Sequence, residues 1–296
     1  MRRLVACAAG VPLLVATACT APAERRTAID IDDFGDTLAL DSAPTRIVSL
    51  VPTTTEILFT IGAGDRLVGR SHWDHWPAAA LRVPDVGDGM RPNLEAILAV
   101  RPDLVVLYAG EENRPAAQRL RAAGIPTLGL RIDRIAETQR AIRLLGLVTG
   151  DTTDARMLAD SIDATLLAVR RATRGLPAPR VAWKVWDAPL MVIGGGSYLS
   201  ELIEIAGGTN VYADSPEPSP QISLEDLLRR DPDLILAGPE GAGSLNRLPG
   251  WRALRAVRNG GVLVVDTALM GRPGVRLGEA AVSLAGLLHP ELAPIR

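Results

Sequence analysis

The pattern of hydrophobic and polar positions along residues 93–107 returns along residues 223–237. Both stretches open with a side chain that can accept a backbone N–H at a helix start, Asn93 in the first and Ser223 in the second. Apolar residues follow at helical spacing, a Pro-Asp pair ends the helix, and an apolar run of strand type comes next. Each stretch therefore predicts one short helix followed by one strand.

A second matched pair, residues 55–62 and 200–207, occurs in the same order. Each predicts a helix that Thr55 or Ser200 caps and that a glycine closes. Two matched pairs in one order predict two similar α/β lobes. A cleft between such lobes is where we expect a ligand to sit.

Residues 152–173 form one continuous helical pattern, about 33 Å long at 1.5 Å per residue. Its apolar stripe consists of Leu158, Ile162, Leu166 and Val169. Strand and helix alternate elsewhere, which predicts mostly parallel sheets. The fold class is therefore α/β, with two similar lobes, each a mostly parallel sheet flanked by helices, joined by one long rigid helix. We expect lobes at residues 28–150 and 176–296 and the bridging helix at 151–175.

Shorter apolar runs predict further strands. Residues 28–31 and 37–40 flank a polar turn and predict a hairpin at the start of the first lobe. In the second lobe, residues 211–212 predict a strand, and residues 262–265 predict a buried one.

Composition narrows the class of protein. The chain has 296 residues, 47% of them apolar and 22% charged, with a formal net charge of -2. These values are typical of a folded globular protein large enough for two domains. Lysine and arginine form no cluster along the sequence, so we expect no nucleic-acid partner.

The N-terminus resembles a bacterial lipoprotein signal. A short basic start and an apolar run reach small residues just before Cys19. The resemblance implies a signal peptide at residues 1–18, lipidation of Cys19 and a tether at residues 19–27. The alternative is a simple secreted precursor. In both cases we expect an extracytoplasmic protein of the cell envelope. In the lipoprotein case the membrane would hold it only through the lipid anchor.

Tryptophan is the most informative residue type. Aromatic residues make up only 3% of the chain, yet four of the five tryptophans form two Trp-x-x-Trp pairs, Trp73/Trp76 and Trp183/Trp186. Trp183, on a strand, is expected in the core, whereas Trp73 and Trp186 are expected to contact a ligand. One buried indole contributes on the order of 4–6 kcal/mol gross, and micromolar binding needs about 8 kcal/mol net. Two or three rings could therefore dominate recognition of a large, flat ligand.

Metal-binding and catalytic motifs are the next features to consider. His72 and His75 flank Asp74, but the only other histidine is His289, so we expect no protein-held metal site. Axial ligation of haem by one loop histidine remains an alternative to simple solvated histidines. The run Gly194–Gly196 before Ser197 lacks the spacing of a nucleophile elbow or a phosphate loop. It indicates a close backbone approach at a helix start, and we expect no enzyme activity.

Several segments together resemble the substrate-binding proteins for vitamin B12, haem and ferric siderophores. These are residues 46–52, 55–58, 93–95, 101–104 and 206–211. The resemblance covers about residues 28–290. It implies two α/β lobes bridged by a rigid helix, a ligand in the cleft, no resident cofactor, and delivery to an ABC permease dimer with its ATPase. We expect a monomer.

Within that family the chain looks most like the vitamin B12 binders. Their loop and strand-end aromatics fall on Trp73 and Tyr108, and their permease-docking glutamates fall on Glu95 and Glu225. Two of their tryptophan positions hold Ser219 and Gly89 here, and Trp186 is expected to compensate. The candidate ligand contacts are Trp73, Asp74, Trp76, Gly89, Met90, Tyr108, Trp186, Gly196, Ser219, Met270 and Arg272.

The resemblance implies a corrinoid ligand, with haem or a ferric siderophore as the alternative. Convergence of Arg70, Arg91 or Arg272 on the cleft would favour an anionic siderophore. A distant alternative is an envelope hydrolase that uses the same two-lobed frame.

Overall fold

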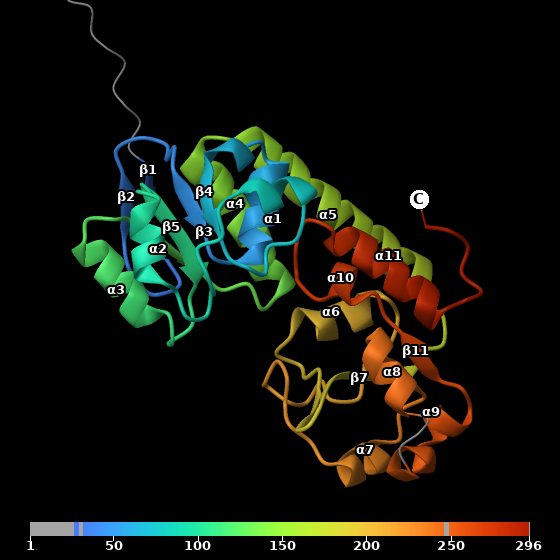
Figure 1. Ribbon diagram of the computed structural model, residues 1–296. Coiled ribbons are helices and arrows are strands. Elements are labelled where there is room, and N and C mark those ends of the chain that lie inside the picture. The colour runs from blue at the N-terminus through green and yellow to red at the C-terminus, as the bar shows by residue number, and fades with distance from the viewer. Residues whose placement is uncertain (1–26, 30–31, 246–248, 296) are drawn as a thin grey trace, which may run out of the picture.

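The computed structural model describes residues 27–29, 32–245 and 249–295. Figure 1 shows two lobes, each around its own sheet, with the long helix α5 (Thr152–Thr173) running between them. The predicted signal peptide, Cys19 and the tether up to residue 26 lie outside the described residues. The mixed α/β fold with two mostly parallel sheets confirms the predicted fold class.

The N-terminal lobe has a four-stranded sheet of order β4-β3-β5-β6, and all of its pairings are parallel. Its strands are β3 (Ile47–Ser49), β4 (Leu67–Arg70), β5 (Leu104–Tyr108) and β6 (Thr127–Leu130). Its helices are α1 (Pro52–Thr60), α2 (Leu94–Ala99), α3 (Arg114–Ala122) and α4 (Ile135–Thr149), with 3-10 turns η1 (Gly64–Arg66) and η2 (Ala78–Arg82). The predicted hairpin is the antiparallel pair β1 (Thr27–Ile29) and β2 (Leu38–Leu40).

The C-terminal lobe has a sheet of order β11-β10-β7-β8, with β9 also paired to β7. Only the β7–β8 pairing is antiparallel among these described strands. The strands are β7 (Arg180–Asp187), β8 (Leu190–Val192), β9 (Thr209–Asn210), β10 (Leu234–Ala237) and β11 (Val262–Val264). The helical segments are α6 (Tyr198–Ile205), α7 (Leu224–Arg230), α8 (Pro239–Leu245), η3 (Pro249–Ala253), α9 (Arg255–Arg258), α10 (Thr267–Met270) and α11 (Leu277–Leu288).

The bridging helix α5 is packed along much of its length. It lies against α4 of the first lobe and α11 of the second, as Figure 1 shows. Ile162, Leu166 and Val169 of the predicted stripe are buried there, while Leu158 is half-buried. Burial of this apolar stripe on both neighbours makes α5 a fixed connection and not a flexible linker.

The repeated helix–strand unit is closely preserved in both lobes. The side chains of Asn93 and Ser223 cap α2 and α7, each accepting a backbone N–H at 3.1 Å. After each helix comes a residue with positive φ, Arg101 at 47° and Asp231 at 40°. The aspartate two residues further on then accepts a backbone N–H at the start of a central strand, from Arg46 just before β3 and from Arg180 at the first position of β7. This shared detail supports the two similar lobes predicted from the repeat.

Some local predictions were wrong. Helix α1 begins at Pro52 and α6 at Tyr198, so Thr55 and Ser200 lie inside helices and cap neither. Proline suits the first helical position because its missing N–H would be unpaired there, and Ser197 supplies the cap of α6. The predicted strand at residues 211–212 is a turn that follows β9, and β11 is half-exposed with Val264 open to solvent.

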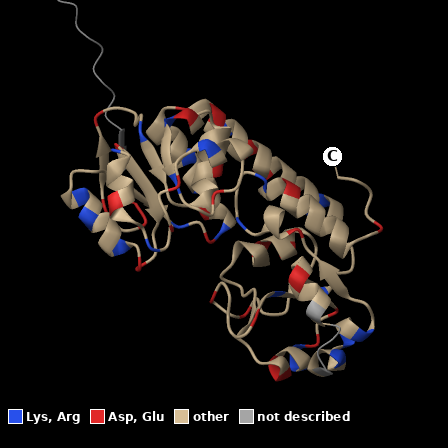
Figure 2. Cartoon of the chain, in the orientation of Figure 1, with Lys and Arg blue, Asp and Glu red and all other residues tan. Residues whose placement is uncertain are grey.

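Charged residues of both signs are interspersed along the helices of both lobes in Figure 2. Within the part of the chain that the structure describes, no helix combines the length and apolarity needed to span a bilayer.

Candidate functional site

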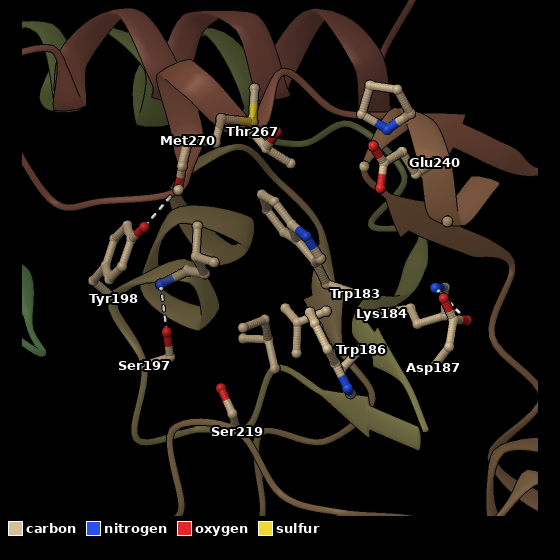
Figure 3. A pocket seen from close by; sticks show the side chains of 17 residues that line it. Trp183, Lys184, Trp186, Asp187, Ser197, Tyr198, Ser219, Glu240, Thr267 and Met270 are labelled. Atoms are coloured by element: carbon tan, nitrogen blue, oxygen red, sulfur yellow. Dashed lines mark hydrogen bonds and ion pairs between the residues drawn. The ribbon is translucent and has the colours of Figure 1, made fainter. Parts of the chain in front are cut away.

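A cavity of about 600 Å³ lies in the C-terminal lobe at the carboxyl end of β7 (Figure 3). Its walls come from the end of β7, the start of α6, the start of α8, the helix α10, and Ser219. The carboxyl ends of parallel strands are where open α/β sheets usually bind ligands, since helix N-termini and loops converge there. Its volume falls within the usual range for small-molecule sites.

Strand β7 places its two tryptophans in different environments. Trp183 is buried, with an exposed fraction of 3%, whereas Trp186 is 61% exposed. The register of the β7–β8 pair shifts between Lys184 and Trp186. The indole N–H of Trp186 donates to the carbonyl of Ala188 at 3.1 Å, which holds the ring in place with much of its surface open. Trp186 therefore presents an apolar face to any ligand in this cavity.

Most of the charged groups around the cavity are carboxylates, which accept hydrogen bonds. Lys184, the only lysine of the chain, is buried, and its ammonium lies 2.7 Å from the carboxylate of Asp187. Glu240 adds an exposed carboxylate at the rim. Among the described lining residues Lys184 is thus the one cation, and it is already paired. The cavity favours a ligand that donates hydrogen bonds over one that carries carboxylates.

The opposite wall is connected to the N-terminal lobe. The phenol of Tyr198 donates to the carbonyl of Met270 at 2.6 Å, and its backbone N–H donates to the carbonyl of Asp133 at 2.7 Å. The Tyr108 hydroxyl in turn donates to the Asp133 carboxylate, at 2.9 and 3.0 Å from its two oxygens. Burial, with the Asp133 contact, raises the pKa of Tyr108, so its hydroxyl remains a donor. Asp133 therefore links the strand-end tyrosine of one lobe to the cavity wall of the other.

The loop with the first tryptophan pair meets the C-terminal lobe. Trp73 is 55% exposed, its ring centroid lies 4.5 Å from that of His72, and its carbonyl lies 3.5 Å from a guanidinium nitrogen of Arg272. The guanidinium of Arg276 lies over the Trp76 ring at 5.0 Å. Asp74 is fully buried, and burial raises its pKa to about 6 against the opposing effect of hydrogen bonds from Ser71. This loop is therefore part of the contact between the lobes.

The predicted ligand contacts do not form one cluster. Trp186, Ser219 and Met270 line the 600 Å³ cavity together. Trp73, Asp74, Trp76 and Arg272 gather at the contact between the lobes, while Met90 lines a separate cavity of about 520 Å³ next to α2 and α3. Gly89 is buried against the carbonyl of Leu50, and a Cβ there would lie 2.0 Å from that oxygen. A tryptophan could not replace Gly89 without moving this backbone.

The glycine run before α6 is a close backbone approach, as predicted. Cβ atoms added at Gly194, Gly195 and Gly196 would lie 2.1–2.2 Å from carbonyl oxygens of residues 213–217. This contact holds the proline-rich loop beside the cavity, which Ser219 of that loop lines. Gly196 itself does not line the cavity; it packs against the backbone of the loop that carries Ser219.

The three histidines do not line the 600 Å³ cavity, and the three arginines of the siderophore alternative do not line it either. His72 and His75 lie in the Trp73 loop, and His289 is buried after α11. Arg70 lies 3.8 Å from Asp85, Arg91 lines the 520 Å³ cavity, and Arg272 lies 3.5 Å from Glu56. The convergence that would have favoured an anionic siderophore is therefore not seen in this cavity.

Sequence reasoning missed several lining residues. Lys184, Asp187, Tyr198, Glu240 and Thr267 all border the cavity. The signal that could have found Lys184 is its being the only lysine, placed between the two tryptophans of β7. Glu95 and Glu225 are exposed in the first turns of α2 and α7, and these helices lie in different lobes (Figure 1).

Comparison with known proteins gives a consistent result. Residues 47–269 match the sequence profile of the family described as periplasmic binding protein. The vitamin B12-binding protein of Pectobacterium carotovorum is 30% identical over 250 residues, 83% of this chain and 88% of that protein. An uncharacterised ABC transporter substrate-binding lipoprotein of Bacillus subtilis is 28% identical over 273 residues, covering 89% and 86%.

Solved structures show the same architecture. The periplasmic vitamin B12 binding protein of Vibrio cholerae superposes with a TM-score of 0.74 at 26% identity, over 84% of this chain and 98% of that one. A periplasmic haem-binding protein of Pseudomonas aeruginosa gives a TM-score of 0.76 at 26% identity, over 86% and 95%. Overall similarity therefore does not separate a corrinoid from haem.

Proposed function

Because this chain belongs to the periplasmic binding protein family, whose members here are binding components of ABC importers and not enzymes, we propose that it captures a corrinoid between its lobes. It then delivers this ligand to an ABC permease dimer driven by its ATPase. The family and the lipoprotein relative place the protein outside the cytoplasm. Anchoring through Cys19 and a monomeric state are part of the same proposal.

The lining of the 600 Å³ cavity beside Trp186 is the observation that favours a corrinoid. A corrinoid is a large, flattened macrocycle with carboxamide arms, so it offers both an apolar face and many N–H donors. Trp186 offers an exposed ring, and Asp187, Glu240 and Ser219 offer acceptors around it. Haem carries two carboxylates, which would need cations or donors, and the one cation among the described residues of this wall is paired with Asp187.

Haem is the second candidate. The half-buried His72 ring, beside the exposed Trp73, is the observation that favours it, because an imidazole can ligate haem iron. A Soret band in the purified protein would support haem in place of a corrinoid.

Delivery would use one carboxylate from each lobe. Glu95 and Glu225 occupy equivalent first-turn positions on repeated helices and are exposed. Two equal charges at equivalent positions suit docking on two arginine pockets of a permease dimer. We propose lobes at residues 28–150 and 176–296 with the bridge at 151–175, so that the two carboxylates lie on different lobes.

The proposal is tested by titrating the purified protein with cyanocobalamin while following tryptophan fluorescence. Saturable quenching with a Kd at or below about 1 µM is expected, since two stacked rings can supply most of about 8 kcal/mol. A flat titration at high micromolar ligand would reject the corrinoid.

A further inference from the structure

Two carboxylates occupy equivalent positions in the duplicated fold. Glu56 and Glu201 are the second residues of the matched stretches 55–62 and 200–207, one on α1 and the other on α6. Both face the opposite lobe. Neither lines the 600 Å³ cavity, and neither is one of the exposed docking carboxylates proposed on α2 and α7.

Glu201 of the C-terminal lobe receives donors from the start of α4 in the N-terminal lobe. Its Oε1 accepts from Nε of Arg134 at 2.5 Å, and its Oε2 accepts from the backbone N–H of Ile135 at 2.9 Å. Arg134 also donates to the carbonyl of Gly195 at 2.7 Å. The contact therefore joins the N-cap and first residue of α4 to α6 and to the glycine run before α6.

Glu56 of the N-terminal lobe lies against the segment before α11 in the C-terminal lobe. Its Oε1 lies 3.5 Å from Nη1 of Arg272 and has no hydrogen-bond partner in the part of the chain that the structure describes. A Cβ added at Gly274 would lie 2.3 Å from Oε2 of Glu56, so the backbone of this segment lies directly on the carboxylate. Glu56 is 1% exposed.

The two contacts are reciprocal because α4 and α11 hold equivalent places. Each is the last helix before or after the bridge, and each packs on α5. Each lobe thus places one carboxyl group at, or just before, the start of the other lobe's closing helix. These two contacts connect the lobes in addition to α5, the Tyr198–Asp133 hydrogen bond and the contacts of the Trp73 loop.

We propose that Glu56 and Glu201 are a matched pair of positioning residues that set the angle between the lobes and so the spacing of Trp73 from Trp186. The proposal rests on the proposed function only in taking the space between the lobes as the ligand site. The ligand-free angle between the lobes is the quantity that these residues control.

The test is a distance measurement by pulsed electron paramagnetic resonance without ligand. Spin labels are placed on exposed positions of the two lobes through Gln118→Cys on α3 and Asn259→Cys after α9, in the full chain with Cys7 and Cys19 replaced by serine. The variants are Glu56→Gln, Glu201→Gln and the pair combined. Glu279→Gln is the matched control, since Glu279 is an exposed first-turn carboxylate of α11.

The parent and Glu279→Gln should give one narrow distance distribution. The combined variant should shift its mean by more than about 2 Å, the scale of domain rearrangements, or broaden it to a similar extent. Should the combined variant lose its folded circular dichroism, Gly274→Ala decides, because it pushes on Glu56 without removing a charge. A distribution unchanged from the parent in the folded combined variant, or in Gly274→Ala where it decides, overturns the proposal. Failure of the cobalamin titration would not affect this result.

Discussion

The ammonium of Lys184 lies 2.7 Å from the carboxylate of Asp187 at the edge of the 600 Å³ cavity. The lysine is buried while the Asp187 side chain is 53% exposed, so the aspartate both neutralises the lysine and faces the ligand space. This single pair makes the wall acceptor-rich and leaves it without a free cation among its described residues.

Substituting Asp187 with asparagine should change ligand preference. Asp187→Asn releases the Lys184 charge towards the cavity, so affinity for haem should rise and affinity for cyanocobalamin should fall. We expect their ratio to change about tenfold, equivalent to about 1.4 kcal/mol. Parallel spectroscopic titrations measure this ratio, with Glu217→Gln as a control that removes an exposed carboxylate outside the cavity lining. An unchanged ratio would contradict the charge argument.

The two tryptophans of β7 should separate binding from stability. Trp186→Ala removes a ring that is already largely exposed, so unfolding should be little affected while cobalamin affinity falls about 30-fold, or about 2 kcal/mol. Trp183→Ala leaves a hole in the core and should lower the free energy of unfolding by about 3–5 kcal/mol. Calorimetric binding and urea unfolding of both variants check this. Equal affinity losses without a stability difference would be inconsistent with the observed burial.

Stability should depend on pH through Glu56. Burial raises its pKa from 4.5 to about 7, against the opposing effects of Arg272 and Arg276. A carboxyl with a raised pKa stabilises the folded state most below its unfolded pKa, and this stability is lost as pH rises towards 7. The loss between pH 4.5 and 7 should be of order 3 kcal/mol at most.

Glu56→Gln should flatten that part of the profile, because the amide does not ionise. Thermal unfolding between pH 4.5 and 8 compares it with the parent and with Glu279→Gln, whose carboxylate is exposed. An equally steep profile in Glu56→Gln would assign the pH dependence to other groups, with Asp74 the first to examine because its pKa is also raised, to about 6.

Much of the architecture was predictable because it is written in local pattern. The repeats around Asn93 and Ser223, the helix at 152–173 and the parallel strands all follow from spacing and capping within a few residues. The helix starts at Pro52 and Tyr198 were missed because capping side chains further along competed for the assignment.

The site was harder to predict because its contacts join distant segments. Arg272 contacts Glu56, and Tyr198 contacts Asp133, although the partners are far apart in the sequence and lie on different lobes. Sequence pattern marks Trp186 as unusual, but it does not reveal that Lys184 is paired or that Trp76 lies under Arg276. These depend on tertiary placement, which periodicity does not encode.

Transport should depend on the two exposed first-turn carboxylates. Reversing both, Glu95→Lys with Glu225→Lys, should abolish uptake of labelled cobalamin in cells, while the affinity of the purified variant stays unchanged because neither residue lines the cavity. Glu279→Lys, another exposed first-turn reversal, should leave uptake intact. Normal uptake by the doubly reversed variant would remove the docking role.

The most direct test of the central claim is a parallel titration of the purified parent and Trp186→Ala with cyanocobalamin and with haem. The account predicts one saturable cobalamin site in the parent, weakened about 30-fold in Trp186→Ala, with haem bound more weakly than cobalamin by the parent. Tighter binding of haem than of cobalamin, or cobalamin binding that does not depend on Trp186, would contradict it.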